Sequence, residues 1–412
     1  MASSRQTRPW LWAPFAALLL LACLAAPAAA KAAAATPAAH GAIPANGNQA
    51  YGIPYFSWNH RLRMAIVVLP RDYVPGASGE ALPCIIQLRG RQSTVASAAA
   101  TWGSLPTERH FIVICPESVG RRDPANSWAV PGQIQDILDM PDVVESTVPW
   151  VHVDRTRLYV VGVSMGGQEA LAAAARFPDR IAAAISVDGI ADLAARYREL
   201  PRVGRRSDQR LMRLEVGGTP RTVPFKYAVR SPMNFAGGLA TDGVPLGIWW
   251  SQADRLVVNQ ATTQTGRLYT NIVAQNPAAP VVQVLGNQAH GVMLRNAPGA
   301  ALDFLAPGGV WRNVQTAPPA SWQYQSWLPD VSLWGYRFTT WPGWTTMWSV
   351  AVAPGSLSVL APAPMTVTLP YDAALPAPAT VVFNGVPMSV QPVAGTLTLS
   401  FPAGQTTALI DP

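Results

Sequence analysis

Cysteine, histidine and charged residues are scarce in this chain of 412 residues. It contains three cysteines and five histidines, and Asp, Glu, Lys and Arg together make up 13% of it. Apolar residues make up 49%, a balance typical of a globular chain and unlike that of a disordered one. The formal net charge is +7, but the basic residues are spread along the chain, so we predict no nucleic-acid partner.

The few cysteines and histidines also exclude most metal sites. Cys84 and Cys115 lie near opposite ends of two predicted parallel strands, farther apart than the roughly 7 Å that a disulfide bond tolerates. We therefore expect both to be small buried apolar residues. No pair of histidines has the spacing of metal ligands, so the sequence predicts neither a metal nor a cofactor.

Long apolar runs are absent after the N-terminus, and we expect no segment there to span a membrane. Residues 1–30 combine two arginines, an apolar stretch and three alanines at 28–30, which is typical of an export signal. A membrane anchor and a lipid attachment at Cys23 are the alternatives. We predict a cleaved signal peptide, a flexible linker over 31–50, and a secreted or periplasmic protein; the sequence does not predict the oligomeric state.

A catalytic domain is predicted over residues 51–309, because short apolar runs alternate there with helical stretches. This alternation predicts an α/β fold with a mostly parallel central sheet. The runs lie at 64–69, 84–88, 111–115, 158–163, 181–187, 247–250 and 281–285. A last helix is expected over 292–305, before Pro307.

Residues 188–246 are too many for a simple crossover, so we interpret them as a cap insertion over the carboxyl edge of the sheet. Stretches at 192–200 and 208–214 look helical. Four arginines of this insertion either contact an acidic substrate group or form a solvated helix face: Arg202, Arg205, Arg206 and Arg210.

The character of the chain changes after Pro307. Tryptophans crowd one segment, and alternating strands follow with an Asn384-Gly385 turn between two of them. We predict a small Trp-rich β-sandwich over 318–412. The tryptophans form either a platform for a polymer or a packing surface against the catalytic domain.

The most informative segment is Gly162-Val163-Ser164-Met165-Gly166. A β-branched run precedes it and an alanine-rich helical stretch follows it. A strand, a glycine-flanked serine and a helix make up a nucleophile elbow, in which the serine takes a strained backbone conformation at the end of a sheet strand. Ser164 is therefore the predicted nucleophile.

A serine needs a histidine to take its proton and an acid to orient that histidine. Asp254 follows the strand at 247–250, and His290 follows the strand at 281–285, in the chain order that an elbow fold requires. The other four histidines come before the elbow. For the acid, Asp188 is an alternative because it closes the preceding strand.

The oxyanion of the intermediate needs main-chain donors. One is expected to be the N–H of Met165, directly after the nucleophile. The other is expected from the loop after the strand at 84–88, where Gly90 allows a tight turn and the N–H of Arg91 is the predicted donor.

Together these motifs resemble the α/β-hydrolase superfamily, in its secreted esterase and prolyl-oligopeptidase-like branch. The resemblance rests on the elbow, on Asp254 with the residues behind it, and on Ala289-His290-Gly291, and it covers about residues 60–306. It implies serine hydrolase activity on a small-molecule or polymeric ester. Members often carry His-Gly in the oxyanion loop, where this chain has Arg89-Gly90.

The sequence predicts a secreted serine hydrolase that cleaves carboxylic esters through an acyl-enzyme. The alternatives are a prolyl-oligopeptidase-like serine peptidase, an acyltransferase with the same triad, and a catalytically inert polymer-binding protein on a hydrolase fold. Three tryptophans either line the acyl pocket or belong to the core: Trp102, Trp128 and Trp249.

Overall fold

The computed structural model describes residues 46–74, 80–91, 93–117, 128–341, 346–371 and 379–411. The predicted signal peptide, Cys23 and nearly all of the predicted linker lie outside these ranges. Within them, no helix has both the length and the apolar character needed to span a membrane.

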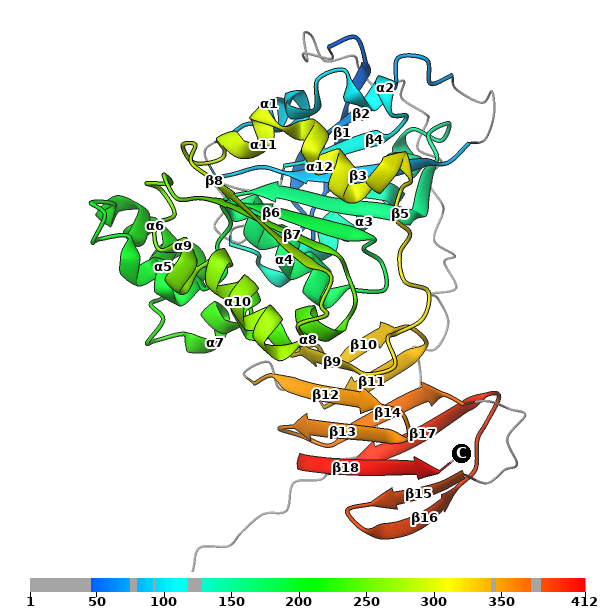
Figure 1. The fold of residues 1–412 in the computed structure, drawn as a ribbon. Coiled ribbons are helices and arrows are strands. Elements are labelled where there is room, and N and C mark those ends of the chain that lie inside the picture. Colours follow the sequence, from blue (N-terminus) through cyan, green and yellow to red (C-terminus); the bar gives the residue numbers. More distant parts are fainter. Residues whose placement is uncertain are drawn as a thin grey trace, which may run out of the picture. The chain divides into compact units, whose positions relative to one another are not determined.

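An eight-stranded sheet has the order β1-β2-β4-β3-β5-β6-β7-β8 (Figure 1). Its strands are β1 (Gln49–Phe56), β2 (Leu62–Leu69), β3 (Leu82–Leu88), β4 (Ile112–Pro116), β5 (Val153–Val163), β6 (Ala183–Val187), β7 (Leu246–Ser251) and β8 (Val281–Gly286). Strands β3 to β8 are parallel, while β1 and β2 pair antiparallel with each other and β2 pairs antiparallel with β4. The mostly parallel sheet is confirmed. Strand β1 was not predicted, and it begins within the expected linker.

Helices cover both faces of this sheet, so its strands are buried on both sides. One apolar core includes residues of α3 (Pro131–Thr147), α4 (Met165–Arg176), α8 (Ala236–Thr241) and α10 (Thr265–Gln275). The core on the other face includes residues of α1 (Val95–Ala99), η1 (Ala100–Trp102), α11 (Val292–Asn296) and α12 (Pro298–Leu305). Short helices complete the region: α2 (Leu105–Glu108), α9 (Gln260–Thr263), and the 3₁₀ turns η3 (Pro232–Phe235) and η4 (Pro307–Gly309). Cys84 and Cys115 lie one in each core, both buried and free.

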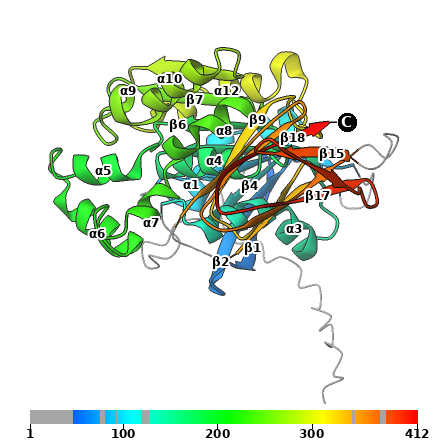
Figure 2. The ribbon, with the colours of Figure 1, turned by 90° about the horizontal axis from the view of Figure 1, so that it is seen from below.

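The cap insertion between β6 and β7 is confirmed. It contains α5 (Leu193–Glu199), α6 (Arg206–Val216) and α7 (Pro224–Ala228), which lie together at one side in both views (Figures 1 and 2). Apolar residues of this insertion, such as Leu193 and Met212, pack with Trp128 and with Met165 of the elbow in a cluster of their own. The cap is therefore packed directly over the elbow.

The C-terminal part is a β-sandwich of two antiparallel sheets, in the orders β10-β11-β14-β17 and β16-β15-β18-β13-β12-β9. Its core holds Trp322, Phe338 and Trp348, all nearly inaccessible. Asn384 and Gly385, both at positive φ, form the predicted turn between two strands. The strands are β9 (Trp322–Ser326), β10 (Asp330–Leu333), β11 (Tyr336–Thr340), β12 (Trp348–Ala353), β13 (Ser356–Ala361), β14 (Met365–Pro370), β15 (Ala379–Phe383), β16 (Val386–Val390), β17 (Thr396–Phe401) and β18 (Gly404–Asp411).

Most of the described tryptophans of this segment are engaged in packing. Trp327 belongs to the apolar core of the eight-stranded sheet, and its ring lies 4.5 Å from the guanidinium of Arg176 on α4. The Tyr324 hydroxyl donates to the main-chain oxygen of Arg176 at 3.1 Å. Trp341 is 77% exposed, and Trp344 lies outside the described residues. These contacts favour a packing role for the segment.

Candidate active site

Ser164 stands between β5 and α4 with φ 60° and ψ −117°, a strained conformation for a residue with a side chain. Two glycines make this turn possible. A Cβ on Gly162 would lie 2.1 Å from the carbonyl oxygen of Gly166, and one on Gly166 would lie 2.5 Å from that of Leu88. The elbow geometry therefore follows from glycine at these two positions, as the sequence indicated.

Asp254 and His290 are brought together by the ends of the neighbouring strands β7 and β8. Their side chains form a hydrogen bond of 2.7 Å between His290 Nδ1 and Asp254 Oδ2. The other oxygen of Asp254 accepts from the main-chain N–H groups of Leu256 and Val257, at 2.7 and 3.0 Å. The carboxylate is thus fixed from both sides, and it can hold the imidazole in a single orientation.

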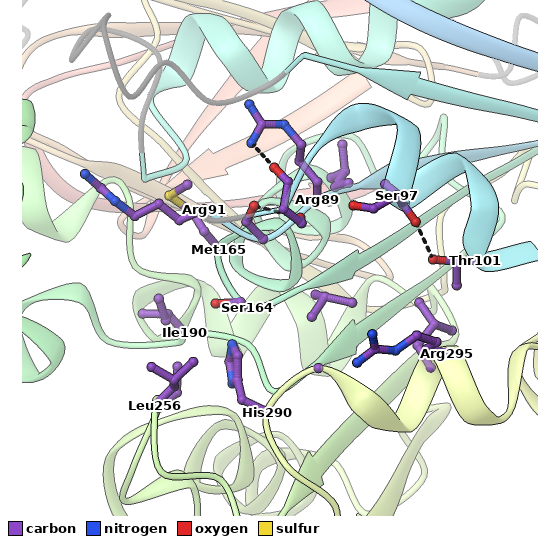
Figure 3. A pocket seen from close by; sticks show the side chains of 18 of the residues that line it. Arg89, Arg91, Ser97, Thr101, Ser164, Met165, Ile190, Leu256, His290 and Arg295 are labelled. Atoms are coloured by element: carbon purple, nitrogen blue, oxygen red, sulfur yellow. Dashed lines mark hydrogen bonds between the residues drawn. The ribbon is translucent and has the colours of Figure 1, made fainter. Parts of the chain in front are cut away.

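Ser164 and His290 line the same cavity, which has a volume of about 630 Å³. In Figure 3 the ring of His290 points toward the Ser164 side chain. The structure therefore gathers the three predicted residues at one edge of the sheet, with the acid behind the histidine and the histidine facing the serine.

Asp188, the alternative acid, lies beside this pair. It is fully buried, at φ 47°, and its two oxygens accept hydrogen bonds from the N–H groups of Ser251 (2.8 Å) and Gly291 (2.7 Å). Burial raises the pKa of Asp188, and the charge of Asp254 adds to this effect. Asp188 thus holds the loop that carries His290, whereas Asp254 holds the ring.

Asp188, Asp254 and His290 offer ligand atoms within 4.8 Å of one another, a spacing that suits a metal ion. Each carboxylate already accepts N–H hydrogen bonds on both of its oxygens. A cation would have to displace these bonds, so the arrangement fits a hydrogen-bonded group of two carboxylates and an imidazole better than a metal site.

The loop after β3 reaches Ser164. A Cβ on Gly90 would lie 3.4 Å from the Cβ of Ser164, so the main chain of this loop runs against the serine. The side chain of Arg91 does not extend into solvent. It forms a two-pronged ion pair with Glu215 of α6, and Trp128 Nε1 donates to the same carboxylate at 2.5 Å. The oxyanion roles of the Met165 and Arg91 N–H groups stay predictions, and Gln92 lies outside the described residues.

The cavity wall bears on two alternatives that the sequence left open. Of the three tryptophans considered for the pocket, Trp128 lines the cavity, while Trp102 and Trp249 lie in the core. Of the four cap arginines, Arg205 lines the cavity and pairs with Asp208 at 2.8 Å. The other three are exposed, as expected of a solvated helix face: Arg202, Arg206 and Arg210.

The sequence reasoning missed Arg196 of α5. It lines the cavity although it is only 5% exposed. Burial lowers its pKa, against the opposing effect of the carboxylates of Glu199 and Asp254. A sequence signal existed, because Arg196 lies four residues after the helix-capping Asp192, on the same face of the helix as the apolar Leu193 and Leu200.

Comparison with known proteins agrees with this geometry. The family model described as "alpha/beta hydrolase fold" matches residues 136–223, which contain the elbow. The chain is 27% identical over 124 residues to poly(3-hydroxyalkanoate) depolymerase C of Paucimonas lemoignei, covering 28% of this chain and 30% of that protein. It is 30% identical over 83 residues to the uncharacterized peptidase YtmA of Bacillus subtilis, covering 20% of this chain and 30% of that protein. The matches thus span about a third of these relatives.

The fold is also that of a solved puromycin-hydrolyzing peptidase of Mycobacterium tuberculosis. The TM-score is 0.50 at 20% identity, and the match covers 63% of this chain and 39% of that one. The mostly parallel sheet, the elbow and the family model lead to one conclusion: the chain has the α/β-hydrolase fold.

Proposed function

We propose that this chain is a secreted serine hydrolase that cleaves carboxylic esters. The observation that carries the proposal is the hydrogen bond between Asp254 and His290, at the wall of a cavity that Ser164 also lines. A strained elbow serine with an oriented imidazole beside it is the arrangement needed for acyl transfer.

In this mechanism Ser164 Oγ attacks the acyl carbon while His290 takes its proton. The N–H groups of Met165 and Arg91 stabilise the oxyanion of the tetrahedral intermediate. His290 then gives the proton to the leaving alcohol, and an acyl-enzyme on Ser164 is left. Water, activated by His290, releases the acid and restores the serine. Asp254 keeps the imidazole in the required tautomer and stabilises its charged form.

The depolymerase relative supports an ester substrate, whereas the peptidase relative supports the second candidate, a serine peptidase. An esterase and a serine peptidase share the acyl-enzyme chemistry, and they differ in whether the bond cleaved is an ester or an amide. An acyltransferase would deliver the acyl group to an alcohol in place of water. An inert binding protein would not react at Ser164 at all.

A fluorophosphonate probe tests the nucleophile. We expect the wild-type protein to be labelled and Ser164→Ala to be unlabelled; an unlabelled wild type would favour the inert binding protein. Turnover of 4-nitrophenyl esters without turnover of aminoacyl nitroanilides supports the esterase, and the reverse result supports the peptidase. Mass spectrometry of the mature N-terminus from the exporting host tests cleavage after residue 30.

A further inference from the structure

The cavity beside Ser164 is lined by far more positive than negative side chains. Among the described lining residues are five arginines and one aspartate: Arg89, Arg91, Arg196, Arg205, Arg295 and Asp208. Internal partners occupy three of the arginines. Arg91 pairs with Glu215, Arg205 pairs with Asp208, and Arg89 donates to the main-chain oxygen of Ser93 at 2.8 Å. Arg196 and Arg295 are left to face the cavity.

Arg196 is the unusual one, because it is buried without adequate partners. Within the described part of the chain, its Nε and Nη1 atoms are inaccessible and have no hydrogen-bond partner. The nearest carboxylate oxygen belongs to Glu199, at 3.8 Å from Nη1. Glu199 is already engaged by the hydroxyl of Thr263 and the amide of Gln264. Guanidinium groups remain protonated in proteins, so a positive charge with free donors is held in a largely apolar wall.

Apolar residues line the same cavity as this charge and Ser164. Ile190, Leu200 and Leu256 line the same cavity, and Figure 3 shows Ile190 and Leu256 near Ser164 and His290. Arg196 also lies close enough to Asp254 for that carboxylate to act on it. An ester bound at Ser164 therefore has both an apolar surface and a guanidinium within the same cavity.

We infer that Arg196 recognises a carboxylate on the substrate, so that the preferred esters carry a negative charge at the far end of a short apolar chain. A guanidinium and a carboxylate form a charge-assisted hydrogen bond, and a substrate carboxylate at this wall would give Arg196 a closer counter-charge than Glu199 does at 3.8 Å. The inference rests on the proposed hydrolase function. It names Arg196 as a specificity residue that contacts the substrate away from the reacting atoms.

The test compares two 4-nitrophenyl esters of equal chain length, the hexanoate and the monoadipate, which differ by a terminal methyl against a terminal carboxylate. We expect Arg196→Gln to lower kcat/KM for the adipate about 10- to 100-fold, because a hydrogen bond to a charged group is lost. Turnover of the hexanoate should change by less than about threefold, because its chain makes no such bond. Arg198→Gln is the matched control, since Arg198 lies on the same helix and is exposed.

Three results would overturn the inference. The first is an equal loss of kcat/KM on both esters in Arg196→Gln. The second is an unchanged kcat/KM for the adipate ester in that variant. The third is that Arg295→Gln, and not Arg196→Gln, loses the preference for the adipate ester. If neither ester turns over and Ser164 resists the fluorophosphonate, the hydrolase proposal itself has failed. Should Arg196→Gln not fold, inhibition of wild-type hexanoate turnover by adipate is compared with inhibition by the uncharged adipamide. Tighter inhibition by adipate supports the inference, and equal inhibition contradicts it.

Discussion

Asp188 and Gly291 are joined across 103 positions of the chain by a hydrogen bond of 2.7 Å, from the Gly291 N–H to Asp188 Oδ2. Because Gly291 directly follows His290, this bond restrains the position of the His290 imidazole. Asp188 is thus a second buried carboxylate that supports the site through the main chain, beside Asp254, which bonds the imidazole ring.

Replacing the two acids should therefore have different effects on an ester substrate. Asp254→Asn keeps one oxygen for the Leu256 and Val257 N–H groups and turns an amide NH₂ toward His290 Nδ1, so it should lower kcat about 10⁴-fold, as expected when the tautomer is lost. Asp188→Asn keeps the volume but can accept only one of two N–H bonds, so we expect a smaller fall, about 10- to 100-fold. Steady-state kinetics on a neutral nitrophenyl ester measures both. An equal or larger loss in Asp188→Asn would reverse the two roles.

The cap is tied to the loop after β3 through Glu215, which accepts hydrogen bonds from Arg91 and from Trp128. Glu215→Gln should leave Arg91 poorly paired and loosen the loop, and we expect kcat/KM and the rate of fluorophosphonate labelling to fall at least about tenfold. Arg210→Gln, at an exposed position of the same helix, serves as the control. Labelling of Glu215→Gln at the wild-type rate would show that the loop does not depend on the cap.

Gly162 should tolerate no side chain. A Cβ there would meet the main chain of Gly166 at 2.1 Å, and neither strand nor helix can move without opening the elbow. We expect Gly162→Ala to yield no folded protein, or one destabilised by more than about 3 kcal/mol. Gly299→Ala, where nothing lies within 4 Å of the new methyl, should be as stable as the wild type. Denaturant unfolding compares the two, and a stable Gly162→Ala protein would contradict this account of the turn.

Asp242 should make stability fall as the pH rises. It is buried, one oxygen accepts from Val244 N–H at 2.9 Å, and burial raises its pKa to about 8 from the usual 3.8. Between these two values the unfolded chain has lost a proton that the folded chain keeps, so raising the pH favours unfolding, and the slope disappears above about pH 8. Asp242→Asn removes this titration. The melting temperature of Asp242→Asn minus that of the wild type should be at least about 2 °C larger at pH 8 than at pH 5. The same difference in melting temperature at both pH values would exclude the effect.

Substitutions at two tryptophans can distinguish a packing role of the β-sandwich from a polymer-binding role. Trp327 is buried against Arg176, so Trp327→Ala should lower the free energy of unfolding by about 3–5 kcal/mol. Trp341 is 77% exposed, and Trp341→Ala should leave stability unchanged. Binding to an insoluble polyester, measured by co-sedimentation, tests the platform. If Trp341→Ala abolishes binding to the polyester while Trp327→Ala does not alter stability, the packing role is wrong and the segment is a binding module.

The sequence was sufficient for the elbow, the parallel sheet and the order of the three catalytic candidates, because each depends on local pattern. Gly162 and Gly166 flank a serine between a strand and a helix, and Asp254 and His290 each follow an apolar strand. Parallel strands end at the same edge, so chain order alone predicts that these side chains meet there. Strand β1 was not predicted because a glycine and a proline interrupt its apolar pattern. It also lies at the edge of the sheet, where it pairs with one strand only.

Only the tertiary structure decided which polar groups share an environment. It distinguished Asp254, which bonds the imidazole, from Asp188, which bonds the loop, although both close a strand in the sequence. It also separated Arg196, buried at the cavity wall, from three exposed arginines of the same insertion. The electrostatic effect of a charged side chain depends on its burial and its partners, and both are determined by segments that lie far apart in the chain.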